Sequence, residues 1–464
     1  MKLSKYLRSI TRENDIVLYH SLFGRLCAVD NTIWRILQEI NQRSLDEVYK
    51  SNDSNFHSEI DEIVEEFTRR RFIVNDNDTS EREYWEKSDA ERFKNSLKGT
   101  QLSFVQLITS NACNFNCNYC FVTNISNIND RHVGASTLNM ALADAISYVR
   151  KAIKVVKSNE NSYLHIQFFG GEPLMNSETI KGILNFFENG EKLGMKITYS
   201  IITNGSLITR EIAEYFLKYS VSVVVSFDGP TGSDRRLRSG KPAINDILRG
   251  LDTLNKSGVD LSFNSVLSSE TFHYFGEELV DCAMCYGVNA VGVLLDLNTD
   301  FYMKAGINRI SDKLLGVYKY AKEKDVQITG YWVSMYESLF KDSEYKKGFK
   351  TCSATGSQIS IEPSGKLFTC KASNGSIGHI DSLNDALMSH GYLKYSKRSI
   401  INSSDCYNCD LEGVCSGMCP GSLEKKYDSI SKMEKSYCNL MKILVKELIM
   451  LEDEKSIETY SVDI

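Results

Sequence analysis

The stretch 104-FVQLITSNACNFNCNYC-120 joins a short apolar run to three cysteines and identifies the core of the chain. The run Phe104–Ile108 has the length and the β-branched and aromatic content of a buried strand. Cys113, Cys117 and Cys120 follow it directly, with three and then two residues between them. Ligands of α/β folds bind at the carboxyl ends of strands, so this spacing predicts a metal-binding loop at such an end.

Five more apolar runs follow this stretch, separated by segments with helical periodicity. Alternating strands and helices predict parallel βα units. Six strands are too few to close an eight-stranded barrel. We therefore expect an α/β fold, a partial (β/α)6 barrel, over residues 101–300. The further runs are Leu164–Phe169, Ile197–Ile202, Val221–Phe227, Leu261–Val266 and Ala290–Leu295.

Composition narrows the class of protein. The chain has 464 residues and 13 cysteines, and its 54 Lys and Arg against 60 Asp and Glu give a net charge of −6. That balance argues against a broadly basic surface for nucleic acid. Neither a secretory signal nor an apolar run long enough to cross a membrane is visible, so we expect a cytoplasmic protein. Cytoplasmic thiols stay reduced, and clustered cysteines there indicate metal more often than disulfides.

Residues 1–80 have the pattern of a winged-helix module, with a hairpin followed by three helices. The second helix begins with a capping box, a serine followed three residues later by a glutamate. Residues 81–100 belong to a charged stretch without clear periodicity and are expected to be an irregular linker. The predicted strands and helix starts are Ile16–Tyr19, Leu26–Val29, Asp30, Ser44 and His57.

Residues 346–445 hold seven cysteines and little regular periodicity, so metal is an expected source of stability for this region. A zinc ribbon needs two C-x2-C pairs about 15–20 residues apart, and only Cys406 and Cys409 form such a pair. Residues 301–345 are expected to bridge the two regions, and residues 446–464 to form a C-terminal tail. The remaining cysteines of this region are Cys352, Cys370, Cys415, Cys419 and Cys438.

Polar and glycine-containing motifs follow three of the predicted strands. Each alone is compatible with an ordinary turn. Together with the cysteine loop they fall at the carboxyl ends of neighbouring strands, which favours a single ligand site. The motifs are Gly170-Gly171-Glu172-Pro173, Thr203-Asn204-Gly205 and Ser226-Phe227-Asp228-Gly229.

This set of motifs resembles the radical S-adenosylmethionine (SAM) superfamily. The resemblance implies a [4Fe–4S] cluster on Cys113, Cys117 and Cys120, whose fourth iron is chelated by the amino and carboxylate groups of SAM. A three-thiolate zinc site or a trio of loop thiols is the alternative from the residues alone. No acid or histidine is assigned as a catalytic base.

The resemblance also implies roles for the polar motifs. Glu172 matches the glutamate of the family's GGEP motif (Gly170, Gly171 and Pro173 complete it), which holds the SAM amino group. An arginine expected after Asp228 stays unassigned, because Leu237 stands at its position among Arg235, Arg236 and Arg238. The further implied SAM contacts are Tyr119 beside the adenine and Thr203, Asn204 and Ser226 at the ribose and carboxylate.

The cysteine spacing of residues 346–445 resembles the SPASM domain of peptide-modifying radical SAM enzymes. The resemblance implies two auxiliary [4Fe–4S] clusters, three clusters in all. Sulfatase maturases carry an extra cysteine where this chain has Gln358, so one auxiliary cluster is expected to have an open iron. The implied ligand sets are Cys406, Cys409, Cys415 and Cys438 for the complete cluster and Cys352, Cys370 and Cys419 for the open one.

Residues 1–80 resemble the precursor-recognition element of maturases of ribosomally made, post-translationally modified peptides. In that family the element binds a leader peptide as an added strand at its sheet edge, packed against the third helix. The module has 11 Lys and Arg against 14 Asp and Glu. This acidic balance argues against DNA, which basic modules bind.

The combined resemblance implies a radical SAM peptide maturase that installs a thioether between a cysteine sulfur and a carbon, of the sactipeptide or ranthipeptide type. Carbon–carbon crosslinking, epimerisation and a sulfatase-type, formylglycine-forming maturase are the alternatives, and a non-enzymatic iron–sulfur protein is disfavoured. The expected partners are a precursor peptide and a reductase such as flavodoxin or ferredoxin, with neither nucleic acid nor membrane.

Overall fold

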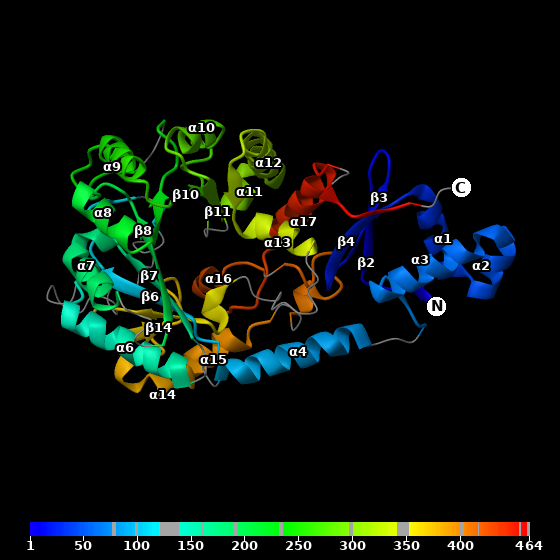
Figure 1. Cartoon of the computed structure of the whole chain (residues 1–464), viewed down its shortest axis with the longest axis horizontal. Helices are drawn as coiled ribbons and strands as arrows, with labels where there is room; N and C mark the ends of the chain where they lie inside the picture. The colour runs from blue at the N-terminus through cyan, green and yellow to red at the C-terminus, as the bar shows by residue number, and fades with distance from the viewer. Residues whose placement is uncertain are drawn as a thin grey trace.

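The computed structural model describes residues 1–76, 80–97, 101–117, 119–120, 139–158, 162–188, 194–231, 235–296, 300–340, 352–399, 403–415, 417–453 and 456–461. In Figure 1 the N-terminal module lies at one end of the molecule and the large sheet with its helices at the other. The cysteine-rich C-terminal region lies between them, beside the long helix α4.

Six parallel strands form the centre of a ten-stranded sheet, as the alternating apolar runs predict. Neighbouring strands pair in chain order, which is the arrangement that βα units produce. The sheet is open, with β12 at one edge and β15 at the other. The six strands are β6 (Phe104–Ser110), β7 (Tyr163–Gly170), β8 (Lys196–Thr203), β9 (Val221–Ser226), β10 (Leu261–Leu267) and β11 (Ala290–Leu295).

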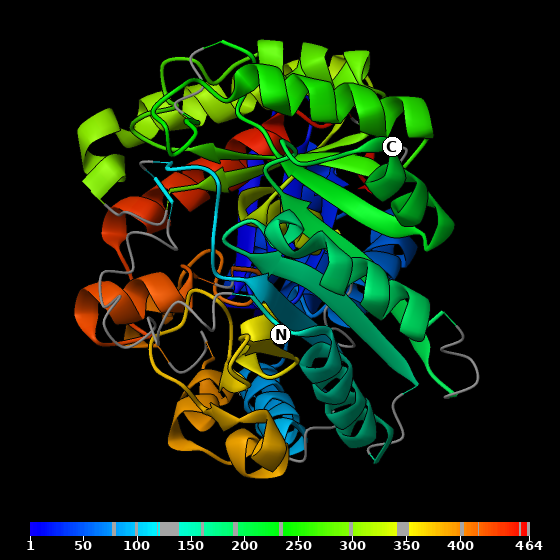
Figure 2. The same cartoon turned by 90° about the vertical axis from the view of Figure 1, so that its left-hand side faces the viewer.

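Helices cover the outer face of this sheet (Figure 2). The strands show why: in β7 Leu164, Ile166 and Phe168 are fully buried, whereas His165 and Gln167 between them are only half-buried. Successive side chains of a strand point to opposite faces, so one face packs against helices and the other lines the concave side. The helices are α6 (Leu142–Ser158), α7 (Ser177–Phe186), α8 (Arg210–Lys218), α9 (Ile244–Ser257), α10 (Glu278–Cys285) and α12 (Ile307–Glu323).

Both ends of the parallel sheet are extended by later segments. β12 (Gln327–Thr329) adds beside β11, and β13 (Gln358–Ile361) pairs in parallel with β6. The antiparallel strands β14 (Lys366–Phe368) and β15 (Gly378–His379) continue from β13. The cysteine-rich region therefore contributes strands to the main sheet, which its weak periodicity does not predict.

The N-terminal module contains the predicted hairpin and three helices. Asp30 caps the first helix through the amide of Ile33, and Ser44 and Glu47 form the predicted capping box. The elements are β1 (Lys2–Leu3), β2 (Leu7–Thr11), β3 (Ile16–His20), β4 (Gly24–Val29), α1 (Asn31–Gln42), α2 (Leu45–Ser51), the short 3-10 turn Ser54–Phe56, α3 (His57–Arg69) and β5 (Ile73–Val74).

Residues 81–100, expected to be irregular, lie largely in the 18-residue helix α4 (Ser80–Leu97), so that expectation is wrong. The helix buries Trp85 together with charged residues instead of an apolar stripe. Glu81 accepts a bond from buried His20 at 2.7 Å, and Arg92 donates to the carbonyl of Ser396. Because charged partners replace apolar ones, the usual helical periodicity of hydrophobic residues is missing.

The C-terminal part closes back onto the N-terminal module. α17 (Lys435–Met450) packs against α12 and α13, and β16 (Thr459–Tyr460) pairs in parallel with β4. The residues expected as a tail therefore form the end of a helix and a strand. No helix in the described part of the chain could span a membrane. The other helices are α11 (Asp300–Ala305), α13 (Tyr331–Leu339), α14 (Leu383–Leu387), α15 (His390–Lys397) and α16 (Pro420–Tyr427).

Candidate active site

The three cysteines of the quoted stretch lie on the loop that leaves the carboxyl end of β6. They are half-buried, and their thiols are close enough to interact electrostatically. Burial, together with the charges of Glu172, Cys117 and Cys120, raises the pKa of Cys113 to about 11. Such a group favours a positively charged ligand, because a metal ion stabilises the thiolates that their mutual repulsion disfavours.

Neighbouring strand ends fix this loop. The side-chain amide of Asn204, after β8, donates to Asn114 Oδ1 at 2.9 Å, and the Asn114 side chain donates in turn to Ser206 Oγ. On the other side Arg238 donates to the carbonyl of Cys113, and Phe115 forms a β-bridge with Leu237. Two later segments, one after β8 and one after β9, therefore help to hold this loop.

Gly170 and Gly171 let the end of β7 approach the base of the cysteine loop. A Cβ on Gly170 would stand 2.0 Å from the carbonyl oxygen of Ser110, and one on Gly171 would stand 2.4 Å from that of Ala112. No side chain fits at either distance. Pro173 follows them and begins a short 3-10 turn that ends at Asn176. The two glycines therefore place Glu172 beside the loop.

Glu172 is the central carboxyl of the site and is almost completely buried. Its oxygens accept hydrogen bonds from Thr203 Oγ1 at 2.6 Å and from the backbone amides of Asn204 and Leu174. Burial raises its pKa to about 7, although these three donors oppose the shift. A buried carboxylate at this pKa is suited to pairing with an ammonium group, which would lower its pKa again.

A second group consists of the buried Asp228 and Arg235 with the half-buried Tyr119. The Tyr119 hydroxyl donates to Asp228, and Arg235 Nε donates to the same carboxylate at 2.8 Å. The guanidinium lies 5.5 Å from the centroid of the Tyr119 ring. Ser265 Oγ donates to the other Asp228 oxygen at 3.1 Å. This network orients the tyrosine that precedes Cys120.

Arg235 and Asp228 are functional candidates that the sequence left without an assignment. Arg235 is buried, whereas Arg236 and Arg238 are exposed. Three arginines within four residues carry no signal of which one points inward, so burial alone identifies it. In the family pattern an aspartate stands three residues before the arginine; here that residue is Asp234, which lies outside the described residues. Ser226 ends β9, with Asn264 of β10 as its neighbour in the sheet.

The seven C-terminal cysteines fall into two groups according to which thiols interact electrostatically. The first group is Cys352, Cys370 and Cys419, and the second is Cys406, Cys409, Cys415 and Cys438. Burial raises the pKa of Cys370, and Cys419 and Cys352 raise it further. These groups match the two sets that the resemblance implies, and the ligand roles stay a prediction. Among the described residues, no three His, Cys, Asp or Glu converge as needed for one metal ion. The second group consists of Cys415, whose pKa burial raises to about 12, with Cys438, Cys406 and Cys409.

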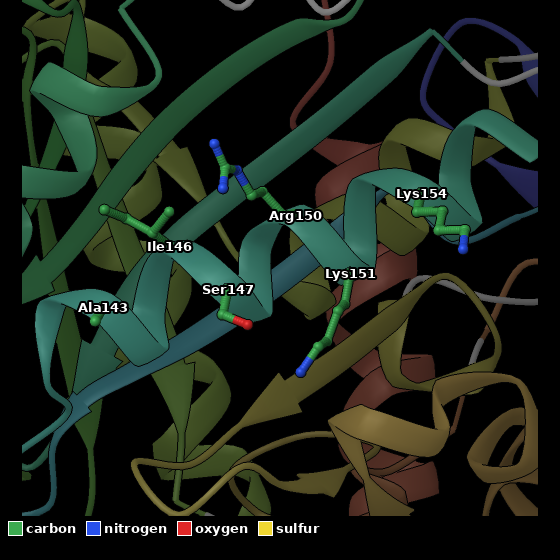
Figure 3. A pocket seen from close by; sticks show the side chains of 6 residues that line it. All are labelled: Ala143, Ile146, Ser147, Arg150, Lys151 and Lys154. Carbon is green, nitrogen blue, oxygen red and sulfur yellow. The ribbon is translucent and has the colours of Figure 1, made fainter.

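Lys371 connects the segment after Cys370 to the cysteine loop of β6. Its ammonium group is buried and donates to Asn111 Oδ1 at 2.6 Å, with Glu362 3.5 Å away. Its backbone amide donates to Gln106 within β6. The segment that follows Cys370 is therefore anchored to β6 and to the start of the cysteine loop. By contrast, the surface hollow over α6 in Figure 3 contains no predicted site residue; it is lined by Ala143, Ile146, Ser147, Arg150, Lys151 and Lys154.

Comparison with known proteins identifies the class that this geometry defines. Residues 107–281 match the model of the Radical SAM superfamily. The chain is also 41% identical over 467 residues to the radical SAM cyclopropyl synthase TigE of Paramaledivibacter caminithermalis, covering 99% of this chain and 98% of TigE. The chain belongs to the radical SAM superfamily and is an enzyme of that superfamily.

Two solved structures share the fold. Streptococcus suis SuiB bound to its precursor peptide SuiA has a TM-score of 0.55 at 18% identity, covering 94% of this chain and 99% of SuiB. Native anSMEcpe with bound AdoMet has a TM-score of 0.62 at 18% identity, covering 77% of this chain and all of that one. At such identity the likeness concerns the fold, an α/β architecture with a parallel-sheet radical SAM core.

The residues present fit the cofactors that the family implies, SAM and a [4Fe–4S] cluster. Three neighbouring thiols on one loop match the ligand set of a [4Fe–4S] cluster with one open iron. The buried carboxylate of Glu172 lies close enough to Cys113 to interact with it electrostatically, so both groups face one site. Its donor set and raised pKa suit the amino group of SAM.

Proposed function

We propose that this chain is a peptide-modifying radical SAM enzyme that forms a carbon–carbon bond, closing a cyclopropane on an aliphatic side chain of a ribosomally made precursor. The observation that carries the proposal is the full-length similarity to TigE, whose name gives cyclopropyl synthesis as its activity. The ring replaces two C–H bonds by one C–C bond, so the peptide loses two hydrogens. One leaves as a hydrogen atom, and the other as a proton with one electron passed to an acceptor.

In the proposed reaction the bound SAM and its reduced cluster supply the 5′-deoxyadenosyl group that takes the hydrogen atom. The chain's own residues position it: Cys113, Cys117 and Cys120 hold the cluster, and Glu172 binds the amino group of SAM. Asp228 keeps Tyr119 in place beside the adenine. Thr203, Asn204 and Ser226 are proposed to contact the rest of SAM. A site that excludes water protects a carbon radical from side reactions.

The two C-terminal cysteine groups are proposed to hold auxiliary clusters that accept the surplus electron. Their support is the electrostatic grouping of the thiols and the attachment of Lys371 to the end of β6. Residues 346–445 are then a SPASM domain, and the enzyme carries three clusters. A flavodoxin or ferredoxin as reductase and a cytoplasmic location stay predictions.

Residues 1–80 are proposed to bind the leader of the precursor. The support is a small sheet beside helix α3, together with the SuiB–SuiA structure, in which a protein of similar fold binds a precursor peptide. A peptide in extended form binds such a sheet by adding a strand to its edge. The module is acidic, so a peptide partner fits it better than nucleic acid.

Thioether formation, the expectation from the resemblance, is the second candidate. The observation that favours it is the group of three cysteines Cys352, Cys370 and Cys419, with Gln358 at the position of a possible fourth. Gln358 is buried and its amide donates to the carbonyl of Thr369. A cluster on three thiolates has an open iron, which is able to hold a substrate thiolate for attack by a carbon radical.

Mass spectrometry separates the two candidates. The enzyme is co-expressed with a candidate precursor peptide, and the product is treated with iodoacetamide before fragmentation. We expect a loss of two hydrogens localised to one aliphatic residue, with every cysteine alkylated. The same loss with one cysteine protected from alkylation would replace the cyclopropane by a thioether. The matched control is Cys117→Ala, which must yield unmodified peptide, whereas Cys282→Ala should yield the product.

A further inference from the structure

The sheet of the N-terminal module is completed by the other end of the chain. Its order is β16-β4-β3-β2, so β16 covers one edge and β2 forms the other. Thr459 and Tyr460 stand opposite Ala28 and Val29 in parallel register. The amide of Ala28 donates to the carbonyl of Glu458 at 2.9 Å, and the amide of Asp30 donates to that of Tyr460 at 3.2 Å. Figure 1 shows this segment running from α17 across to the module.

Two side chains fasten β16 to helix α3. The Tyr460 ring packs edge-on against Phe67 with centroids 5.7 Å apart, and its hydroxyl donates to Glu66 at 2.8 Å. Glu458, two residues earlier, forms an ion pair with Arg70, whose guanidinium lies 5.0 Å from the Tyr460 ring centroid. Alternate residues of a strand share one face, which is why both side chains reach the same helix.

This attachment is small for a strand. β16 has two residues, and Thr459 is exposed. The Glu458 side chain is 60% exposed, so solvent weakens its ion pair with Arg70. Eight residues separate Met450, the end of α17, from Thr459, so release of the strand leaves the helix in place. Besides the partly buried Tyr460, this segment has one buried apolar side chain, Ile457. Segments with few buried apolar contacts open at a low free-energy cost.

We propose that β16 is an exchangeable edge strand that occupies the leader-binding position, so that the leader binds β4 and α3 by displacing it. The proposal rests on the leader-binding role of residues 1–80. It also defines the chemistry of the leader: an extended segment with an acidic residue and, two positions later, an aromatic one, as in Glu458-Thr459-Tyr460. The acidic side chain pairs with Arg70, and the aromatic ring takes the place of Tyr460 on Phe67.

Displacement lowers the apparent affinity for the leader. A peptide that binds only the open edge has its dissociation constant raised by the reciprocal of the open fraction. If the edge is open about one tenth of the time, weakening β16 should strengthen leader binding about tenfold. The C-terminal segment then sets the affinity that a peptide needs in order to bind, so that only a peptide with the matching side chains competes for the edge of β4.

The first experiment follows β16 in the intact chain by hydrogen–deuterium exchange. The leader of the co-expressed precursor is added to the cluster-loaded enzyme, and the amides of residues 456–461 are compared with those of Gly24–Val29. We expect the C-terminal segment to lose protection while β4 keeps it, because the leader replaces one partner by another. Unchanged protection of residues 456–461 at a saturating leader concentration would overturn the proposal.

The second experiment measures affinity by fluorescence anisotropy. The probe is a labelled synthetic peptide SIETYSVDI, the sequence of residues 456–464. The Tyr460→Ala chain should bind this probe and the leader about tenfold more tightly than the wild type, and the leader should displace the probe. The matched control is Ser461→Ala at an exposed neighbour, which should bind as the wild type does. Equal affinities in all three chains, or weaker binding to Tyr460→Ala, would refute the exchange.

The failure of this proposal differs from the failure of the proposed function. Modified peptide can form and the leader can bind while residues 456–461 keep their amide protection and Tyr460→Ala binds the leader no more tightly. In that case the enzyme function stands and the displacement of β16 is wrong. If the leader binds and displaces β16 but no hydrogen is lost from the peptide, the exchange stands and the proposed chemistry is wrong.

Discussion

β13 and β16 both complete a sheet with chain from far along the sequence, and both run parallel to the strand that they join. β13 pairs four residues with β6 and is buried at every position. β16 pairs two residues with β4, and its first residue is exposed. β13 also has β14 on its other side, whereas β16 is an edge. The difference indicates that β13 is a permanent part of the sheet that carries the candidate active site, whereas β16 is a replaceable strand.

The site at the carboxyl end of the parallel strands is expected to be the least tolerant part of the molecule. Arg235→Met should lower the free energy of unfolding by about 3–5 kcal/mol, because it leaves the buried Asp228 carboxylate without its charged partner. Chemical denaturation followed by circular dichroism measures the change. Arg236→Met, at the exposed neighbour, is the control and should change stability by about 0.5 kcal/mol or less. Equal losses in both variants would contradict the structural role of Arg235.

A proline tests whether β13 is a permanent strand. Ser360→Pro should destabilise the chain by about 3 kcal/mol or more, because Ser360 lies inside the sheet between β6 and β14. The same denaturation experiment measures it, and activity should fall with the folded fraction. A loss below about 1 kcal/mol would mean that β13 is no more essential to its sheet than β16 is.

Glu172 makes stability depend on pH. Burial raises its pKa from 4.5 to about 7, so the folded state binds the proton more tightly than the unfolded state does. The wild type therefore loses stability as pH rises from about 4.5 through 7, and the loss reaches roughly 3 kcal/mol above pH 7. Glu172→Gln should remove this loss, so that its thermal midpoint gains on the wild type between pH 5 and 8. The exposed Glu178→Gln should track the wild type, and a pH-independent difference for Glu172→Gln would exclude the shift.

The smallest effect is expected at β16. The carbonyls of Glu458 and Tyr460 accept the bonds from β4, so the amide of Thr459 between them points away from that strand. Thr459→Pro should therefore cost under about 1 kcal/mol, as proline is tolerated on an edge strand whose amide faces solvent. Chemical denaturation beside Ser360→Pro tests the contrast directly. A loss as large as that of Ser360→Pro would show that β16 is integral to its sheet.

Local patterns predict much of this fold. The apolar runs place all six parallel strands within one or two residues of their ends, because strand formation depends on a few consecutive side chains. Asp30 and Ser44 mark helix starts for the same reason, since a cap and its amides lie within three residues. Local patterns do not predict helix α4, because its buried residues Glu81 and Arg92 have their hydrogen-bond partners in other segments of the chain.

In the candidate site too, short-range sequence patterns identify some residues, whereas only the packing of the folded chain identifies others. The spacing of Cys113, Cys117 and Cys120 and the motif around Glu172 are properties of short segments, so the resemblance to the radical SAM superfamily is visible in the sequence. Which arginine completes the site is a property of packing, and only the burial of Arg235 against Asp228 distinguishes it from its neighbours. The bond that the enzyme forms is a further step, which its similarity to TigE addresses and the cysteine spacing does not.

The sequence by itself determined the parallel core, the positions of the cysteine groups and the acidic character of the N-terminal module. Each depends on residue type and short spacing, which fold into the same local structure wherever the segment lies. Only the tertiary structure decided that β13 joins β6 and that β16 covers β4. Those pairings bring together segments hundreds of residues apart, and backbone hydrogen bonds, which make the pairing, carry no sequence signature of their partner.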